Sequence, residues 1–162
     1  MPALAIVQLL VLLMLANGAP VVSKKILGTR FAFPLDAGVA FLDRRPLFGS
    51  SKTIRGILVS IIVTTACAPL VGLRPSIGAL VASTAMTGDL CSSFVKRRLN
   101  LKPSSRAVGL DQVPESLLPL LACRNVFSLT SADITLAVCI FFVGEIILSR
   151  LLYKAHLRDQ PY

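Results

Sequence analysis

Two stretches of this chain, residues 1–23 and 56–73, contain no charged side chain. A helix needs about 20 consecutive apolar residues to cross the hydrocarbon core of a bilayer, and both stretches are close to that length. Only 15% of the residues are charged and 54% are hydrophobic, whereas soluble domains carry charges on about 25% of their residues. The sequence therefore predicts an all-α integral membrane protein. No Lys or Arg precedes the first stretch, as one does in secretory signals, so we expect it to remain as a helix.

Apolar segments bounded by prolines and basic residues predict about five membrane-spanning helices in one domain, residues 1–162. The expected spans are residues 1–23, 56–73, 75–95, 111–129 and 131–152. The first is expected to end at the cluster of Asn17, Gly18 and Pro20, which favours a break in the helix. The fourth is the least regular, because Pro114 and Pro119 disturb helix geometry. This length excludes a large transporter built from two inverted halves.

The basic residues are distributed unequally over the predicted connections. If the N-terminus lies outside, 15 of the 17 Lys and Arg residues fall on the cytoplasmic side, seven of them between the first two spans. Only Arg74 and Arg124 fall outside, as expected from the preference of cytoplasmic loops for positive charge. We therefore expect a multi-pass protein of the cell membrane with a cytoplasmic C-terminus. The net charge of +9 is explained in this way, and no nucleic-acid partner is inferred.

Acidic side chains inside the predicted spans indicate function. A carboxylate at membrane depth is costly unless it is paired, binds a metal or faces water. Asp89 lies in the third span, and Asp111 and Glu115 share one face of the fourth. Antiparallel packing of these spans brings the acids together near the cytoplasmic edge, where oxygen ligands suit Mg²⁺. An ion-pair network that only joins the helices is the alternative, and Glu145 is attributed to pairing with Arg150.

A polar stripe follows Asp89 along the third span towards the cytoplasmic edge. The spacing places five residues on one face of a helix: Asp89, Ser92, Ser93, Lys96 and Arg97. Gly88 leaves room for a close neighbouring helix. Cations at the membrane edge are suited to phosphate groups as well as to lipid headgroups.

The connection between the first two spans contains a Gly-Ser stretch among cations. In RPLFGSSKTIRG, Lys52 and Arg55 follow Gly49 and Ser50, and small residues with free backbone amides beside cations suit a polyphosphate. The segment is not a Walker A loop, because no strand precedes it and its glycine spacing differs. Together with the acids, it indicates an enzyme that joins a water-soluble nucleotide to a lipid phosphate at the cytoplasmic face.

Five segments, in order, resemble those of the archaeal CDP-archaeol synthases, which are similar to the phosphatidate cytidylyltransferases of bacteria and eukaryotes. They are ANGAPV at 16–21, FPLDAG at 33–38, RPLFGSSKTIRG at 45–56, GDLCSSFVKRR at 88–98 and LDQVPESLLP at 110–119. The broader signature has Asp after a Lys where Pro103 follows Lys102, and a second Asp where Pro114 stands. Glu115, one residue later, is the candidate replacement.

The resemblance implies transfer of the cytidylyl group from CTP to 2,3-di-O-geranylgeranylglycerol 1-phosphate, giving CDP-archaeol and pyrophosphate for archaeal ether lipids. The implied partners are CTP, the lipid phosphate and membrane lipids. Physics alone does not select the lipid chains, and the sequence does not give the oligomeric state.

The acids and the cations are expected to have different roles in the site. Asp89, Asp111 and Glu115 are the predicted Mg²⁺ ligands, and Lys52 and Lys96 are predicted to join the two aspartates in catalysis. Asn17 and the backbone near Phe48 are expected to recognise cytosine, since both are expected at chain breaks. The full predicted substrate-binding set is Asn17, Phe48, Gly49, Ser50, Lys52, Arg55, Ser92, Ser93, Lys96, Arg97 and Arg98.

Other classes of membrane protein explain less of the sequence. A small cation channel or metal transporter would also have acids in its spans, but it has no use for a loop with seven cations. A CDP-alcohol phosphotransferase needs an Asp-Gly pair, and no Asp here precedes a Gly. A membrane scaffold without activity leaves the intramembrane acids unexplained.

Overall fold

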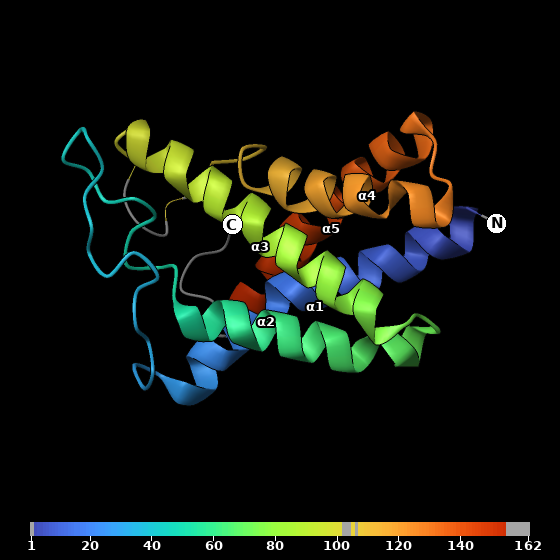
Figure 1. The fold of residues 1–162 in the computed structure, drawn as a ribbon, viewed down its shortest axis with the longest axis horizontal. Helices are drawn as coiled ribbons and strands as arrows, with labels where there is room; N and C mark the ends of the chain where they lie inside the picture. The colour runs from blue at the N-terminus through green and yellow to red at the C-terminus, as the bar shows by residue number, and fades with distance from the viewer. Residues whose placement is uncertain (1, 102–104, 106, 155–162) are drawn as a thin grey trace.

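The computed structural model describes residues 2–101, 105 and 107–154 (Figure 1). The elements are α1 (Pro2–Leu27), α2 (Ile54–Cys67), the 3₁₀ helix η1 (Ala68–Val71), α3 (Pro75–Arg98), α4 (Gln112–Phe127) and α5 (Ser131–Lys154). In these residues the chain forms no strand, only isolated bridges within the loop of residues 28–53. The predicted all-α class is confirmed. Three cations counted on the cytoplasmic side, Lys102, Arg106 and Arg158, lie outside the described residues.

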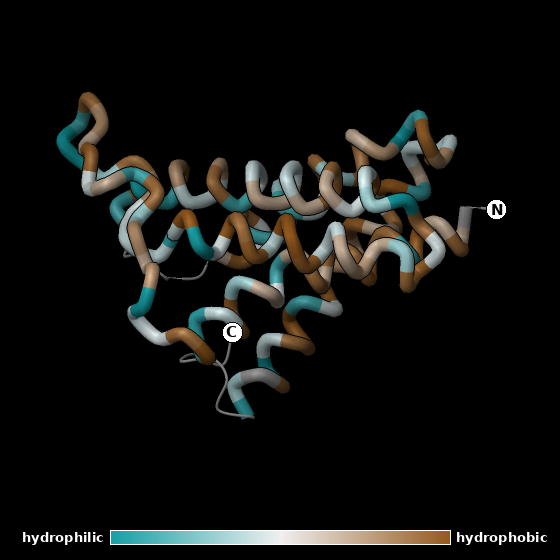
Figure 2. Tube along the Cα trace, turned by 60° about the horizontal axis from the view of Figure 1, so that its bottom comes forward, coloured by the Kyte–Doolittle hydropathy of each residue, from teal (hydrophilic) through white to brown (hydrophobic). Residues whose placement is uncertain are grey.

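Three segments are long and apolar enough to cross a membrane: Ala3–Leu27, Ile54–Val71 and Ser131–Leu151. Figure 2 shows the apolar residues that dominate them. Among the described residues, α3 and α4 do not meet the same requirements of length and hydropathy. α4 has only 16 residues, fewer than a membrane crossing needs, and α3 is less apolar because it contains Asp89 and a basic last turn. The predicted count of five spans therefore stays a prediction.

Helix α1 continues through the cluster at which we expected it to end. It runs to Leu27 with Pro20 inside it, so the expected break at Asn17–Pro20 is wrong. Pro20 has no N–H to donate to the carbonyl of Ala16. The Oγ of Ser60 in α2 donates to that carbonyl instead, at 2.7 Å, which satisfies the acceptor that the proline releases. The helix therefore persists because a neighbouring helix supplies the missing donor.

Glycines allow α3 to pack closely on both sides. A Cβ at Gly78 would come within 2.9 Å of the Thr65 Cα in α2. A Cβ at Gly88 would overlap the backbone of Pro114 and lie 2.8 Å from the nitrogen of Glu115 in α4. The prediction that Gly88 makes room for a neighbouring helix is confirmed. This contact places the acidic face of α3 directly against the start of α4.

The core joins all the helices, while their outer faces remain apolar. Leu12 of α1, Val81 of α3 and Phe141 of α5 are buried. Exposed apolar residues such as Ile62 and Ile147 point outward, as suits lipid contact. The four cysteines are free: Cys123 is buried, Cys67 is half-buried, and Cys91 and Cys139 are exposed.

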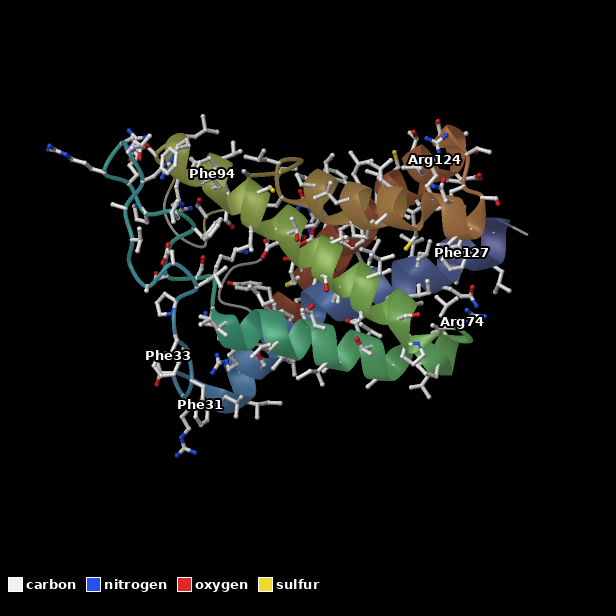
Figure 3. All side chains as sticks on the ribbon, viewed as in Figure 1. Phe31, Phe33, Arg74, Phe94, Arg124 and Phe127 are labelled. Carbon is white, nitrogen blue, oxygen red and sulfur yellow. The ribbon has the colours of Figure 1, made fainter. Side chains whose placement is uncertain are left out.

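The two ends of the helix bundle differ in charge. Arg74 and Arg124 lie at the end that also holds the N-terminus (Figure 3). Phe31, Phe33 and Phe94 mark the opposite end, where the loop of residues 28–53 crosses over the bundle. The fold therefore separates the two cations that we expected outside from the basic loop.

Candidate active site

A cavity of about 740 Å³ lies at the end of the bundle that carries the loop of residues 28–53. Side chains from all five α-helices and from both long connections line it. Its lining includes nine predicted site residues: Ser50, Lys52, Arg55, Asp89, Ser93, Lys96, Arg97, Asp111 and Glu115. The fold therefore brings most of the predicted site together, although its members come from three separate parts of the sequence.

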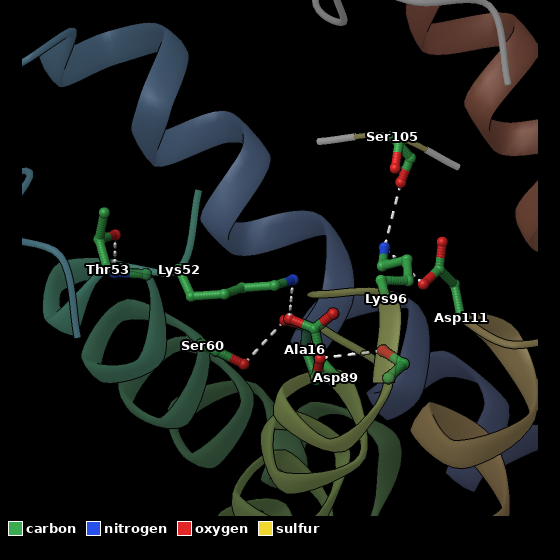
Figure 4. A network of polar contacts seen from close by, with 10 residues as sticks. Ala16, Lys52, Thr53, Ser60, Asp89, Lys96, Ser105 and Asp111 are labelled. Carbon is green, nitrogen blue, oxygen red and sulfur yellow. Dashed lines mark hydrogen bonds and ion pairs between the residues drawn. The ribbon is translucent and has the colours of Figure 1, made fainter. Parts of the chain in front are cut away.

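Lys52 forms an ion pair with Asp89 in this cavity (Figure 4). Lys52 immediately precedes the start of α2, where the Oγ of Thr53 accepts a hydrogen bond of 3.1 Å from the Gly56 N–H. This cap fixes the backbone from which the lysine reaches α3. Burial by itself lowers the pKa of Lys52, but the charge and hydrogen bond of Asp89 together with the charges of Glu115 and Asp111 outweigh it. The pKa is therefore raised, and the ammonium stays charged at neutral pH.

A second ion pair joins Lys96 of α3 to Asp111, with the Nζ and Oδ1 atoms 2.7 Å apart. Lys96 also donates to the carbonyl of Ser105 at 3.1 Å (Figure 4). Asp111 stands at the N-cap position of α4, but its side chain makes no capping hydrogen bond. Its carboxylate instead accepts from the Ala107 N–H at 3.2 Å and pairs with Lys96. The acid is thus drawn into the cavity.

The acidic faces of α3 and α4 meet, as the sequence predicts. The side chain of Glu115 is within hydrogen-bonding reach of Asp89. Both acids are close enough to Lys52 to interact with its charge, and Glu145 of α5 is close enough to interact with Glu115. Two carboxylates this near each other repel unless a proton or a cation is shared between them. The site therefore holds several acids that depend on neighbouring positive charge.

The donor set of the cavity fits Mg²⁺ in its chemistry. Asp89, Glu115 and Asp111 offer only oxygen atoms, which are the ligands this hard cation prefers. Within the part of the chain that is described, no three His, Cys, Asp or Glu side chains form a ready-made metal site. In this arrangement Lys52 and Lys96 are the cations beside the acids. Metal binding here would therefore require the acids to exchange partners.

The loop that presents Lys52 is held by Asp36, to which sequence reasoning gave no role. The Asp36 carboxylate accepts hydrogen bonds from the backbone N–H groups of Phe48, Gly49 and Gly38, at 3.0, 2.9 and 3.2 Å. Burial raises the pKa of Asp36, but these three hydrogen bonds lower it more, so the net shift is downward. The expectation of free amides at Phe48 and Gly49 is therefore wrong, because a side chain of the same loop already occupies them.

Arg98 does not face the cavity. Its guanidinium pairs with Asp43 at 2.9 Å, donates to the Pro46 carbonyl at 2.6 Å, and lies 5.0 and 4.8 Å from the ring centres of Phe41 and Phe94. These contacts fasten the tip of the loop to the end of α3. The prediction that Arg98 binds substrate along with its two neighbours is not supported by this position, since a helix turns the third residue of a basic run away from the first.

Four further predicted substrate-binding residues also lie outside the cavity lining: Asn17, Phe48, Gly49 and Ser92. Asn17 is inside α1 and not at a chain break, and it lines a separate space of about 20 Å³. The hydroxyl of Ser92 donates to the Asp89 carbonyl at 2.9 Å within α3. Arg55 does line the cavity, and its guanidinium also donates to the carbonyls of Gly28 and Arg30.

Other lining residues had no assigned role in the site. Lys24 and Lys25 reach the cavity because α1 continues past Pro20, and the sequence indicated them only as loop cations. Gln112 is buried and accepts from the Gly109 N–H at 2.8 Å. Glu145, the intramembrane acid of α5, also lines the cavity. The sequence attributed this acid to pairing with Arg150, although its depth in an apolar helix was a signal that could have assigned it to the site.

Membrane-compatible helices around a cavity of paired acids and lysines define an intramembrane enzyme for charged substrates. The sequence model of one protein family, described as CarS-like and CDP-archaeol synthase, matches residues 3–162. The chain therefore belongs to the CDP-archaeol synthase family, and it is a cytidylyltransferase of membrane-lipid biosynthesis.

Individual relatives agree with the family match. A CDP-archaeol synthase of Pyrococcus furiosus is 42% identical over 107 residues, which cover 60% of this chain and 60% of that protein. One from Pyrobaculum calidifontis is 32% identical over 169 residues, covering 97% of this chain and 98% of that protein. A solved structure of an intramembrane enzyme for archaeal membrane lipid biosynthesis superposes with a TM-score of 0.72 and 27% identity, covering 85% of this chain and 90% of that one.

Proposed function

We propose that this protein transfers the cytidylyl group of CTP to the phosphate of 2,3-di-O-geranylgeranylglycerol 1-phosphate, giving CDP-archaeol and pyrophosphate. One observation carries the proposal: a cavity of about 740 Å³ holds lysines and carboxylates from α3, α4 and the loop before α2. A triphosphate and a lipid phosphate together bring about six negative charges, so the site that joins them needs closely placed cations.

The reaction forms one bond and breaks one. An oxygen of the lipid phosphate attacks the α-phosphorus of CTP, and the bond from that phosphorus to the oxygen bridging to the β-phosphate breaks. Pyrophosphate leaves with the electron pair. The lipid phosphate is already ionised at neutral pH and needs no strong base. Lys52 and Lys96 bind phosphate oxygens and reduce the repulsion between the two substrates, with Ser50, Ser93, Arg55 and Arg97 around them.

Asp89, Glu115 and Asp111 are the residues that would hold Mg²⁺. The ion, when bound, offsets the charge on the phosphates and on the leaving pyrophosphate. Lys52 and Lys96 then exchange their carboxylate partners for phosphate oxygens. The distinction between acids that hold the metal and lysines that hold phosphate follows from their charge and from their pairing in the cavity.

We further propose five membrane-spanning helices with the N-terminus outside, so that the cavity opens to the cytoplasm of a cell-membrane protein. The separation of Arg74 and Arg124 from the basic loop supports this orientation (Figure 3). A single Cys in place of Ser50 should be labelled by an impermeant thiol reagent only after the membrane is opened. Labelling from the outside of intact cells would reverse the orientation.

The activity is tested by incubating purified protein with CTP labelled in the cytosine ring and Mg²⁺. The archaeal lipid phosphate and phosphatidate are offered in parallel. We expect label in the lipid fraction and one pyrophosphate released per lipid, with preference for the archaeal substrate. Absence of labelled lipid with either acceptor contradicts the proposal. A cation channel or metal transporter, the alternative from the sequence, is not favoured by the family match.

A further inference from the structure

We propose that Asp36 is a positioning residue, which holds the loop before α2 so that Lys52 points into the cavity. The inference rests on the proposed role of Lys52 in phosphate binding and adds a residue that acts on it from outside the cavity. Asp36 does not line the cavity, so it does not itself touch the substrates.

The first argument is the number of hydrogen bonds that converge on one buried side chain. Asp36 is 7% exposed, although it lies in a loop whose other residues are mostly exposed. Its Oδ2 accepts from the Phe48 and Gly49 N–H groups, and its Oδ1 accepts from the Gly38 N–H. Hydrogen bonds to a charged acceptor are about twice as strong as neutral ones. Asp36 is therefore the point at which two distant parts of the loop are joined.

The second argument is the short path from Asp36 to Lys52. Leu35, next to Asp36, donates its N–H to the Lys52 carbonyl at 2.8 Å. Gly49, which Asp36 binds, accepts from the Lys52 N–H at 3.2 Å. Both backbone groups of Lys52 are thus bonded to residues that Asp36 fixes or adjoins. Gly49 has a φ of +89°, which glycine adopts readily and a residue with a Cβ does not, so the turn that Asp36 binds depends on a glycine at this position.

The third argument is that the carboxylate cannot be replaced by the amide of the same shape. Both Asp36 oxygens face N–H donors, and an Asn side chain offers only one oxygen acceptor. Its NH₂ group would meet a backbone N–H at one of the two positions. Asp36→Asn therefore changes the hydrogen bonding of the loop while removing almost no volume.

The test is a double-mutant cycle on purified, folded protein, using Asp36→Asn, Lys52→Ala and the double variant. Initial rates are measured against CTP with Mg²⁺ and the archaeal lipid phosphate. We expect Asp36→Asn to lower kcat/KM for CTP about tenfold in the wild-type background, and less than about twofold in the Lys52→Ala background. Asp133→Asn is the matched control, since Asp133 also accepts a backbone N–H, from Thr130, and its helix α5 starts opposite the cavity end.

A second readout separates positioning from loss of fold. Hydrogen–deuterium exchange of a peptide covering residues 45–53 should be faster in Asp36→Asn, while α5 peptides stay unchanged. If Asp36→Asn does not give folded protein, Asp36→Ser, which keeps one acceptor in a smaller side chain, takes its place in the cycle.

The outcomes distinguish this inference from the proposed function. Equal losses in both backgrounds, or unchanged loop exchange, overturn the positioning role even if Lys52→Ala is impaired. Normal CTP kinetics in Lys52→Ala itself would instead remove Lys52 from the proposed site, and the role of Asp36 with it. A loss in the Asp133→Asn control equal to that of Asp36→Asn would also overturn the inference, because it would show a general effect on stability.

Discussion

The two ends of the helix bundle differ in the kind of contacts that hold them together. At the end with Arg74 and Arg124, helices are joined by short turns with local hydrogen bonds, and the Nε2 of Gln8 in α1 also donates to the Val71 carbonyl at 2.7 Å. Gly72, with a φ of +78°, ends η1, and its N–H bonds to carbonyls within that element. Thr130 and Asp133 cap α5 through hydrogen bonds of 2.9 and 3.2 Å. At the cavity end, the contacts join residues far apart in sequence and involve charge.

This difference shows which polar contacts stabilise the fold and which are explained by function. Local caps satisfy the ends of helices with small polar groups and stabilise each by about 1 kcal/mol. Half-buried ion pairs such as Lys52 with Asp89 gain little over apolar packing, because the charges lose part of their hydration. The charged end therefore contributes little to stability for the number of polar groups it holds, and its retention is explained by the chemistry of the cavity.

The largest expected effect is a loss of activity from substitutions at the cavity end, with the fold of the other end unchanged. Asp89→Asn and Asp111→Asn should each nearly abolish CDP-lipid formation and leave folded protein, because the amide keeps the shape but loses the charge that holds a cation. Melting temperature and specific activity are measured on the same samples, with Mg²⁺ titrated from zero. Asp133→Asn serves as the control. Retained Mg²⁺-dependent activity in either cavity variant would refute the assignment.

A smaller loss of activity is expected when Lys52, the lysine that pairs with Asp89, is replaced. Lys52→Ala should raise the CTP concentration needed for half-maximal rate or lower turnover, by about 1.5 to 3 kcal/mol, the range for one hydrogen bond to a charged group. Steady-state kinetics with varied CTP measure this. The same substitution at Lys154, near the end of α5, is the comparison. Wild-type kinetics in Lys52→Ala would assign the lysine to orientation in the membrane alone.

A substitution at the opposite end is expected to change the stability of the protein and not its kinetics. Gly72→Ala places a Cβ on a residue with positive φ, 3.5 Å from the Nε2 of Gln8, and should cost about 1 kcal/mol of folding free energy. The melting temperature should fall, while the KM for CTP of the folded protein stays the same. A change in that KM would show that the two ends are coupled, contrary to the comparison.

The smallest effect concerns pH. The pKa of Asp36 is lowered in the folded protein, so its contribution to stability is present above the ordinary Asp value of 3.8 and is lost as the pH falls towards the folded pKa. Exchange of residues 45–53, normalised to a peptide of α5, should increase only below about pH 4. Asp36→Asn should lack this dependence. An equal acid response in both proteins would assign it to another group.

Segments whose structure depends on local pattern were predictable. The apolar stretches gave α1, α2 and α5, and the Gly88 contact with α4 followed from residue size. The acids of α3 and α4 face each other because their spacing is helical and the two helices are consecutive. Features that depend on distant partners were not predictable. α1 passes Pro20 because Ser60, 44 residues from Ala16, supplies a donor.

The loop illustrates the same limit within the site. A basic run such as Lys96 to Arg98 looks uniform in sequence, yet Lys96 faces the cavity and Arg98 fastens the loop. Arg98 is held by Phe41 and Asp43, more than 50 positions earlier, whereas Lys96 pairs with Asp111. Similarly, nothing local indicates that Asp36 will bind the amides of Phe48 and Gly49, because the folded loop alone brings them together.

The two ion pairs of the cavity also bear on which species enters it. A triphosphate arriving alone would draw Lys52 and Lys96 away and leave Asp89 and Asp111 as uncompensated negative charges. A divalent cation arriving alone would leave the two ammonium groups uncompensated. Arrival of both together lets every charge change partner at once, so the count of opposite charges stays balanced throughout. We therefore expect the cavity to select the metal–nucleotide complex over either component, in the manner of an ion exchanger loaded with its own counterions.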